Sequence, residues 1–344
     1  MIIFDGVIFS LQRMGGISVL FKEVIRRMPS GSCRVVGFRE MPPPGLGPAE
    51  YEARSARRLE RYRRADFGGE GGVFHSTYYR LPARNGPKVV TTVYDFVYER
   101  YATWPRRIVH SAQKRQAVAK SDRIICISEN TRRDLLEFMG HQYESRTVVI
   151  PLAAADTFHP LGGAQRRPQV LFVGSRADYK NFDAVMLAVS RLPELTLMIV
   201  GGGSLTAHEQ RLLTLHLHGR FHAVGYLADD ALNAEYNRSL CLAYPSLYEG
   251  FGIPILEAMR AGCPVVAFNG SSIPEVAGDA ALLLERGTAD EIAAQFARLL
   301  HGKLRDDLVT RGLARGALFT WDATAAHTAA VYEALSPSPH SKPR

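Results

Sequence analysis

The chain has 344 residues, too many for one typical domain and enough for two of about 150 to 180 residues. Hydrophobic residues make up 46% and charged residues 22%, as in globular proteins, and no apolar run approaches the ~20 residues of a transmembrane helix. The first residues carry Asp5 and no basic segment, which argues against a secretory signal. Four scattered cysteines without metal-site spacing predict reduced thiols, no metal centre and a cytoplasmic protein.

The net positive charge of the chain comes entirely from its first half. Residues 1–165 contain 25 Lys and Arg against 16 Asp and Glu, a net charge of +9, whereas residues 166–344 carry −1. Such an excess indicates an anionic partner, such as a phosphorylated lipid or a membrane surface. Nucleic acid is the alternative, but the aromatic residues do not alternate with the basic run as a stacking platform requires. The charge therefore favours peripheral contact with the inner face of a membrane, without nucleic-acid binding.

The first half alternates strand-like and helix-like segments, the pattern of a parallel sheet. Gly15 and Gly16 separate a first strand, predicted at 1–4 and 7–9, from a helix predicted over 19–28. Such a glycine pair can present N–H groups to a phosphate, although a plain tight turn is the commoner explanation. Further strands are predicted at 33–38, 72–76, 88–97 and 122–127, and basic helices at 51–65 and 105–120. The first basic helix is either a solvated face or a dock for a membrane or a phospholipid-linked acceptor.

Two polar residues, His75 and Asp95, fall at or just past the carboxyl ends of predicted buried strands. Ligands bind at this edge of a doubly wound sheet, so both residues are candidates for the acceptor side of an active site. A lone His or Asp at such a position is more often a hydrogen-bonded structural residue.

The second half begins with a buried strand over 169–174, which Arg176 and Lys180 follow at the mouth of the next helix. Two cations beside a helix N-terminus can hold a diphosphate without metal, and a surface pair of basic residues is the equal alternative. A later strand ends in the glycine turn 201–203. The Gly-x-Gly-x-x-Gly fingerprint with an acidic residue about 20 positions on is not formed, so a dinucleotide is not predicted.

The stretch 243–262 predicts a strand, a glycine turn and a short helix. Glu249 precedes the turn and Glu257 lies in the helix. Gly250 and Gly252 let the backbone approach a ligand closely, and the helix N-terminus adds free N–H groups and partial positive charge. Either carboxylate alone is more often a surface residue, but the joint pattern is suited to a sugar nucleotide.

The segment Glu249-Gly-Phe-Gly-Ile-Pro-Ile-Leu-Glu257 resembles the E-x7-E motif of retaining glycosyltransferases of family 4. The resemblance continues through 258–267 and 270–278 and spans most of residues 1–335. It implies the α/β GT-B fold, in which two Rossmann-like, doubly wound domains face each other across a cleft. The expected parts are an acceptor domain over 1–160 with the helix 320–335 packed back on it, a donor domain over 166–319 and, from composition, a disordered tail over 336–344.

The resemblance also implies roles for individual residues. Glu249 would hold the sugar hydroxyls, Glu257 the ribose, and Arg176 with Lys180 the diphosphate and the charge of the leaving group. Asp95 matches the acid of the family's His-Asp pair, although a tyrosine stands in place of the His, and it would act as a base or electrostatic partner of the acceptor hydroxyl. The catalytic candidates are Asp95, Glu249, Arg176 and Lys180. The donor-binding candidates are Gly15, Gly16, Arg176, Lys180, Tyr226, Glu249, Gly250, Phe251, Gly252, Ile253 and Glu257.

The expected reaction is the metal-independent transfer of a hexose from a nucleotide sugar, with retention of configuration, to a glycan or a polyprenyl-diphosphate-linked acceptor. The segment Tyr179-Lys-Asn-Phe182 resembles bacterial mannosyl- and rhamnosyltransferases of surface polysaccharide and lipopolysaccharide assembly, which favours a GDP-sugar as co-substrate and no bound cofactor. A non-transferase enzyme such as a 2-epimerase and a basic, non-catalytic binding protein stay open. A glycosidase is disfavoured, since both carboxylates lie in one turn-and-helix unit beside a phosphate clamp.

Overall fold

The structure is a computed structural model, and it describes residues 1–344 except 13–14, 47–50, 69–71, 103, 301–302 and 337–344. The chain divides into two compact units. Unit 1 comprises Met1–Leu152 together with the chain from Trp321 onward, and unit 2 comprises Ala153–Thr320. The division after Leu152 falls somewhat earlier than the boundary expected near residue 160. Apart from Ser336, the expected disordered tail lies outside the described residues.

Unit 1 is built on a parallel sheet whose seven described strands follow the order β3-β2-β1-β4-β5-β6-β7. These strands are β1 (Ile2–Asp5), β2 (Cys33–Gly37), β3 (Tyr51–Ala53), β4 (Val73–Ser76), β5 (Lys88–Val93), β6 (Arg123–Cys126) and β7 (Thr147–Val149). The described helices are α1 (Ile8–Leu11), α2 (Gly16–Ile25), α3 (Val97–Tyr101), α4 (Trp104–Lys120), α5 (Glu129–Met139) and α13 (Trp321–Leu335). The strand order reverses between β1 and β4, the kind of switch point at which doubly wound sheets bind ligands.

Two predictions in unit 1 are wrong. The residues 7–9 do not extend the first strand, because α1 begins at Ile8, whose N–H donates to the Thr77 hydroxyl at 3.1 Å. The basic helix predicted over 51–65 is absent from the described chain: β3 pairs with β2 there, and only the 3-10 turn η1 (Glu60–Tyr62) follows. Pairing with the sheet edge outweighs helix propensity in this segment.

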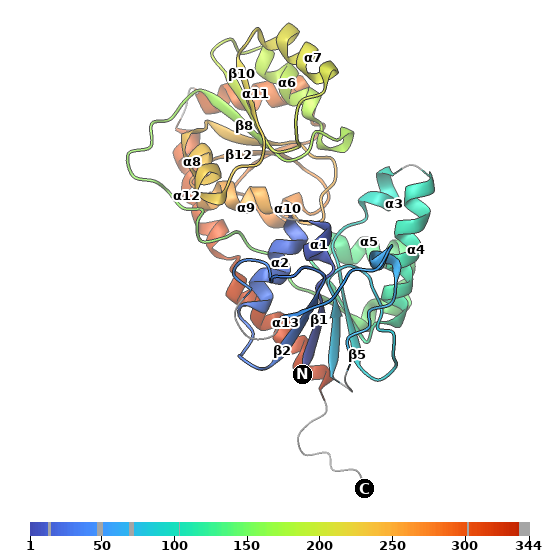
Figure 1. The fold of residues 1–344 in the computed structure, drawn as a ribbon. Coiled ribbons are helices and arrows are strands. Elements are labelled where there is room, and N and C mark those ends of the chain that lie inside the picture. The colour runs from blue at the N-terminus through green and yellow to red at the C-terminus, as the bar shows by residue number, and fades with distance from the viewer. Residues whose placement is uncertain (13–14, 47–50, 69–71, 103, 301–302, 337–344) are drawn as a thin grey trace. The chain divides into compact units, whose positions relative to one another are not determined.

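The last helix, α13, belongs to unit 1 and lies beside α2 (Figure 1). Its Tyr332 meets the rings of Phe4 and His75 edge-on, with centroids 6.0 and 5.7 Å apart. All three side chains are buried. The end of the chain therefore completes a core that begins with the first strand.

Unit 2 contains a six-stranded parallel sheet in its described residues, in the order β10-β9-β8-β11-β12-β13. The strands are β8 (Gln169–Val173), β9 (Thr196–Val200), β10 (Phe221–Val224), β11 (Cys241–Tyr244), β12 (Val265–Phe268) and β13 (Leu282–Leu284). The described helices are η3 (Asp178–Lys180, a 3-10 turn), α6 (Phe182–Ser190), α7 (Ala207–Leu217), α8 (Asp229–Arg238), α9 (Ile253–Arg260), α10 (Ile273–Ala277), α11 (Ala289–Leu300) and α12 (Leu304–Ala317). This is the strand order of the dinucleotide-binding Rossmann fold, with its switch point between β8 and β11.

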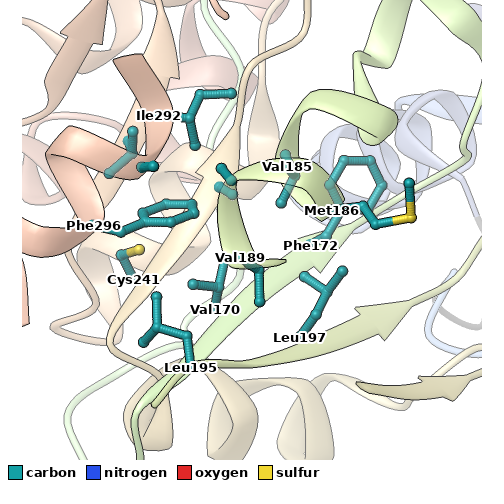
Figure 2. Close-up of a cluster of buried hydrophobic side chains, with 14 of the residues drawn as sticks. Val170, Phe172, Val185, Met186, Val189, Leu195, Leu197, Cys241, Ile292 and Phe296 are labelled. Carbon is teal, nitrogen blue, oxygen red and sulfur yellow. The ribbon is translucent and has the colours of Figure 1, made fainter. Parts of the chain in front are cut away.

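The core of unit 2 fixes the two strands that flank this switch point. Figure 2 shows side chains of β8, β9 and β11 packed against those of α6 and α11. Phe296 of α11 and Val185 of α6 are completely buried. The labelled members are Val170, Phe172, Val185, Met186, Val189, Leu195, Leu197, Cys241, Ile292 and Phe296. Because this core is close-packed, the loops that leave β8 and β11 start from rigid positions.

Candidate active site

The turn between β11 and α9 is held from two sides by serines that follow β12. The Glu249 N–H donates to Ser271 Oγ at 2.9 Å, and Ser272 Oγ donates to the carbonyls of Glu249 and Phe251 at 3.0 and 2.8 Å. Gly252, immediately before α9, has φ +107°, a conformation that favours glycine. The residues of the turn are therefore fixed before any ligand binds.

Lys180 and Glu249 meet at the switch point of unit 2. Lys180 Nζ lies 2.5 Å from Glu249 Oε1, and the two side chains are only 12% and 13% exposed. The Lys180 ammonium also lies 5.4 Å from the ring centroids of Tyr179 and Tyr244. The Leu247 N–H donates to the Tyr179 carbonyl at 2.8 Å, which ties the loop after β8 to the loop after β11. The structure thus brings together one predicted cation and one predicted carboxylate.

Glu257 lies on α9, one helical turn inside the same unit. Its carboxylate accepts a hydrogen bond from the Tyr236 hydroxyl at 2.9 Å. Burial raises the pKa of Glu257 to about 7, while the Tyr236 hydroxyl partly offsets this rise. The carboxyl therefore changes its protonation state near neutral pH.

Two buried tyrosines, Tyr236 and Tyr244, lie beside these carboxylates and were not among the predicted site residues. Burial raises the pKa of Tyr244 well above its ordinary value, and the charges of Glu249 and Glu257 raise it further. Tyr236 is completely buried and donates to Glu257. A tyrosine at the last position of a buried strand, as Tyr244 is, is the sequence signal that could have indicated one of them.

Three other predicted donor-binding residues differ in their exposure and position. Tyr226 is 62% exposed. Its partial burial raises the pKa of its hydroxyl, and the charges of Asp229 and Glu257 raise this pKa further. Phe251 is buried and packs edge-on against Phe319, with centroids 6.0 Å apart, so its main chain is what remains available to a ligand. Ile253 is the first residue of α9.

Arg176 is not positioned as predicted. Its Nε donates to Glu209 Oε1 at 2.6 Å, and its Nη atoms donate to the carbonyls of the turn that follows β9. The side chain is 5% exposed. Both predicted cations are engaged within unit 2, Lys180 with Glu249 and Arg176 with Glu209 and the turn after β9.

In unit 1, Asp95 and the glycine pair lie near the carboxyl edge of the sheet. Asp95 follows β5 by two residues, its carboxylate accepts from the Val97 N–H at 3.1 Å, and its carbonyl accepts from Lys114 Nζ at 2.6 Å. Gly16 opens α2, three residues before the helix start that the sequence predicted. These positions are compatible with the expected roles.

His75 lies in the core, which corrects its prediction as an acceptor-side residue. Its Nδ1 and Nε2 lie 2.6 and 2.9 Å from the hydroxyls of Tyr332 and Thr92. The residue is 1% exposed, and burial lowers the pKa of His75 to about 3, so the ring is neutral. Both ring nitrogens are occupied by the protein, and none is left for a substrate.

We expect Tyr332→Phe to destabilise unit 1 without affecting catalysis. The substitution leaves one buried His75 nitrogen without its partner, which costs about 1–3 kcal/mol of unfolding free energy. Chemical denaturation measures the loss, and Tyr62→Phe, at a side chain that is 52% exposed, is the matched control. If the variant changed the KM of an acceptor and left the stability unchanged, His75 would have to be assigned to the active site again.

Two family models of glycosyltransferases together match most of this chain. A family model described as "Glycosyl transferases group 1" matches residues 156–315, and one described as "Glycosyltransferase Family 4" matches residues 23–154. The chain belongs to glycosyltransferase family 4.

Curated relatives of the chain include bacterial mannosyltransferases. The O-antigen chain mannosyltransferase B of Escherichia coli is 28% identical over 285 residues, which cover 76% of this chain and 74% of that protein. The MMP alpha-(1->4)-mannosyltransferase of Mycolicibacterium hassiacum is 30% identical over 61% of this chain and 53% of its own length. The serotype-specific mannosyltransferase WbdA of Escherichia coli is 30% identical over 71% of this chain, which spans only 33% of WbdA.

Solved structures share the fold at low sequence identity. Sucrose-phosphate synthase from Thermosynechococcus elongatus superposes with a TM-score of 0.76 and 18% identity, covering 97% of this chain and 98% of that one. WaaG, a glycosyltransferase involved in lipopolysaccharide biosynthesis, superposes with a TM-score of 0.74 and 14% identity, covering 98% and 100%. The predicted fold class is therefore confirmed.

Two features are absent from the described part of the chain. None of its helices is both long and apolar enough to cross a membrane. The same residues contain no group of three or more His, Cys, Asp or Glu side chains that could hold a metal ion.

Proposed function

We propose that the chain is a retaining hexosyltransferase that moves a mannose- or rhamnose-type sugar from a GDP-sugar to a glycan or lipid-linked acceptor in bacterial surface polysaccharide synthesis. The observation that carries the proposal is the Lys180–Glu249 pair at the switch point of unit 2, with Glu257 nearby on α9. The identity of the relatives as mannosyltransferases supports the choice of sugar.

The geometry suits the donor as follows. An ammonium has three N–H donors, and Lys180 uses one on Glu249, which leaves two for phosphate oxygens. Lys180 would stabilise the charge that develops on the departing diphosphate, in a site where solvent is largely excluded. Glu249 would accept from sugar hydroxyls and Glu257 from the ribose. In unit 1, Asp95 would meet the acceptor hydroxyl as a base or electrostatic partner, and Gly15 and Gly16 would face the diphosphate.

The acceptor side of the proposal includes peripheral contact with an anionic membrane. The loop that follows β3 exposes arginines together with two large apolar side chains, Leu59 at 65% and Tyr62 at 52%. The combination of basic and apolar side chains is suited to a lipid surface. Co-sedimentation with vesicles tests it, since binding should require anionic lipid and weaken with salt.

The test of the function is a panel of GDP-, UDP-, dTDP- and ADP-sugars. We expect thermal stabilisation by a GDP-sugar alone, and transfer to a mannose-containing glycan in which the anomeric configuration of the donor is retained, as read by NMR. A product that is an epimerised sugar formed without acceptor would establish the 2-epimerase alternative. No stabilisation by any member of the panel in a folded protein would favour the binding-protein alternative.

A further inference from the structure

The Arg176 side chain makes an unusually complete set of contacts with one turn. Its Nη1 donates to the Gly201 carbonyl at 3.1 Å, and its Nη2 lies 3.3, 3.4 and 3.0 Å from the carbonyls of Gly202, Gly203 and Ser204. Four consecutive carbonyls between β9 and α7 therefore converge on one guanidinium.

The backbone of this turn is shaped for that convergence. Gly201, Gly202 and Gly203 have φ values of +84°, +70° and +74°. Residues other than glycine rarely adopt this left-handed backbone conformation. A Cβ added at Gly202 would lie 2.6 Å from Arg176 Nη1 and 2.8 Å from the Gly174 carbonyl. The turn thus sits directly on the first residue after β8.

Glu209 holds the guanidinium from the other side. Its Oε1 accepts from Arg176 Nε at 2.6 Å, while its Oε2 accepts from the Thr206 N–H at 2.6 Å in the capping box that opens α7. Burial favours the protonated form of Glu209, but its hydrogen bonds with Arg176 and Thr206 outweigh this effect and lower the pKa of Glu209 to about 2. The glutamate stays ionised, and the contact with Arg176 is charge-assisted.

A guanidinium has five N–H donors, and these contacts leave at most one of them. For the guanidinium to make a bidentate contact with a phosphate, it would have to release the carbonyls of the turn 201–204. Lys180, four residues further along the same loop, keeps two N–H donors for a ligand. The two cations therefore differ in their availability, although their spacing in the sequence suggests a pair.

We propose that Arg176 is a positioning residue: it fixes the glycine turn 201–204 against the loop after β8, and so holds the segment that carries Lys180, instead of binding the donor diphosphate. This inference rests on the proposed function only for the ligand that Lys180 meets. The far end of the loop is anchored separately, because the Asn181 side chain donates to the Gly287 carbonyl at 2.9 Å. Arg176 is the anchor at the near end.

The experiment compares Arg176→Gln, Arg176→Lys and Glu209→Ala with the control Thr206→Ala. The control removes a hydroxyl of the capping box and leaves the Arg176–Glu209 contact in place. Hydrogen–deuterium exchange is measured over 178–181 and 201–206, and GDP binding is measured by calorimetry. We expect Arg176→Gln and Glu209→Ala to accelerate exchange in both segments by about 10-fold or more, and the control to affect only the start of α7.

GDP binding separates positioning from direct contact. A positioning role predicts that Arg176→Gln and Glu209→Ala weaken the Kd by similar factors, about 10-fold, and that Arg176→Lys does not restore it, since lysine lacks the planar fork. If Arg176 instead bound the diphosphate directly, Glu209→Ala would release its guanidinium. That variant would then bind GDP as tightly as the wild type or more tightly. That result, or unchanged exchange over 178–181 in Arg176→Gln, would overturn the inference. If the wild type binds no nucleoside diphosphate, the proposed function fails and the exchange data alone decide the role of Arg176.

Discussion

Replacing Lys180 by glutamine is expected to reduce kcat by about 10²–10³-fold, the usual effect of removing one group that stabilises charge in the transition state. Glutamine is one atom shorter than lysine and keeps an N–H donor, but it carries no charge and cannot neutralise a departing diphosphate. The partial burial of Lys180, at 12% exposure, makes its charge more effective than that of a solvated lysine. Steady-state release of GDP from a GDP-sugar measures the effect.

The matched control for this prediction is Lys303→Gln, at an exposed position of the same unit. It removes the same charge from unit 2, and we expect its turnover to equal that of the wild type. Glu249→Gln should also lower turnover, because the Lys180 ammonium then loses its negatively charged partner and the sugar loses a carboxylate. Turnover of Lys180→Gln within threefold of the wild type would exclude Lys180 from the chemistry.

Glu257→Gln is expected to make the folded protein more stable above pH 7. Burial raises the pKa of Glu257 to about 7 in the folded state, above the ordinary 4.5 that applies to the unfolded chain. The unfolded state therefore loses its proton first as the pH rises, and the wild type loses stability between pH 4.5 and 7. From the size of this shift the loss is at most roughly 3 kcal/mol, and partial exposure of the residue reduces it.

The amide in Glu257→Gln has no charge to bury, and its oxygen can still accept from the Tyr236 hydroxyl. Denaturation midpoints at pH 5 and pH 8 should therefore differ less in the variant than in the wild type, while Glu194→Gln, at an exposed site, should leave the wild-type difference unchanged. Equal pH dependence in Glu257→Gln and the wild type would show that Glu257 does not titrate in this range.

Donor binding should respond to pH in the opposite direction. An ionised carboxylate is the stronger acceptor for a ribose hydroxyl, so GDP affinity in the wild type should rise as the pH passes through 7. Glu257→Gln should weaken binding by about 10- to 100-fold at pH 8, because it replaces a charge-assisted hydrogen bond with a neutral one. It should also remove most of the pH dependence. The same carboxyl would thus reduce stability and favour binding.

The strands and the focal turn could be predicted from the sequence because they depend on local signals. Runs such as 170–173 and 241–244 are apolar or aromatic along their whole length, as expected where both faces of a parallel sheet are covered. The glycine turn before α9 carries its own conformational requirement, which Gly252 meets with its positive φ. Since all described strand pairs are parallel, the carboxyl ends that carry Lys180 and Glu249 had to fall at one edge of the sheet.

Contacts between residues far apart in the sequence could not be predicted. Arg176 is 33 positions from Glu209, and His75 is 257 positions from Tyr332, so no local pattern could show that either was already bonded. The segment 51–65 has the composition of a polar helix, but its first residues pair with β2 as an edge strand. In each case a tertiary contact decided the outcome, and neighbouring residues carried no trace of it.

The insertion of unit 2 between Leu152 and Trp321 has a consequence for synthesis of the protein. As the chain leaves the ribosome, the first 152 residues emerge without α13, so Phe4, Phe21 and His75 lack the helix that covers them. Unit 2 is continuous in sequence and can complete its core first. At elongation rates of about 5–20 residues per second the interval lasts roughly 10–30 s, during which the earlier part of the chain remains incomplete and exposes apolar surface. The helix α13 is thus made after unit 2 and closes the unit that was begun before it.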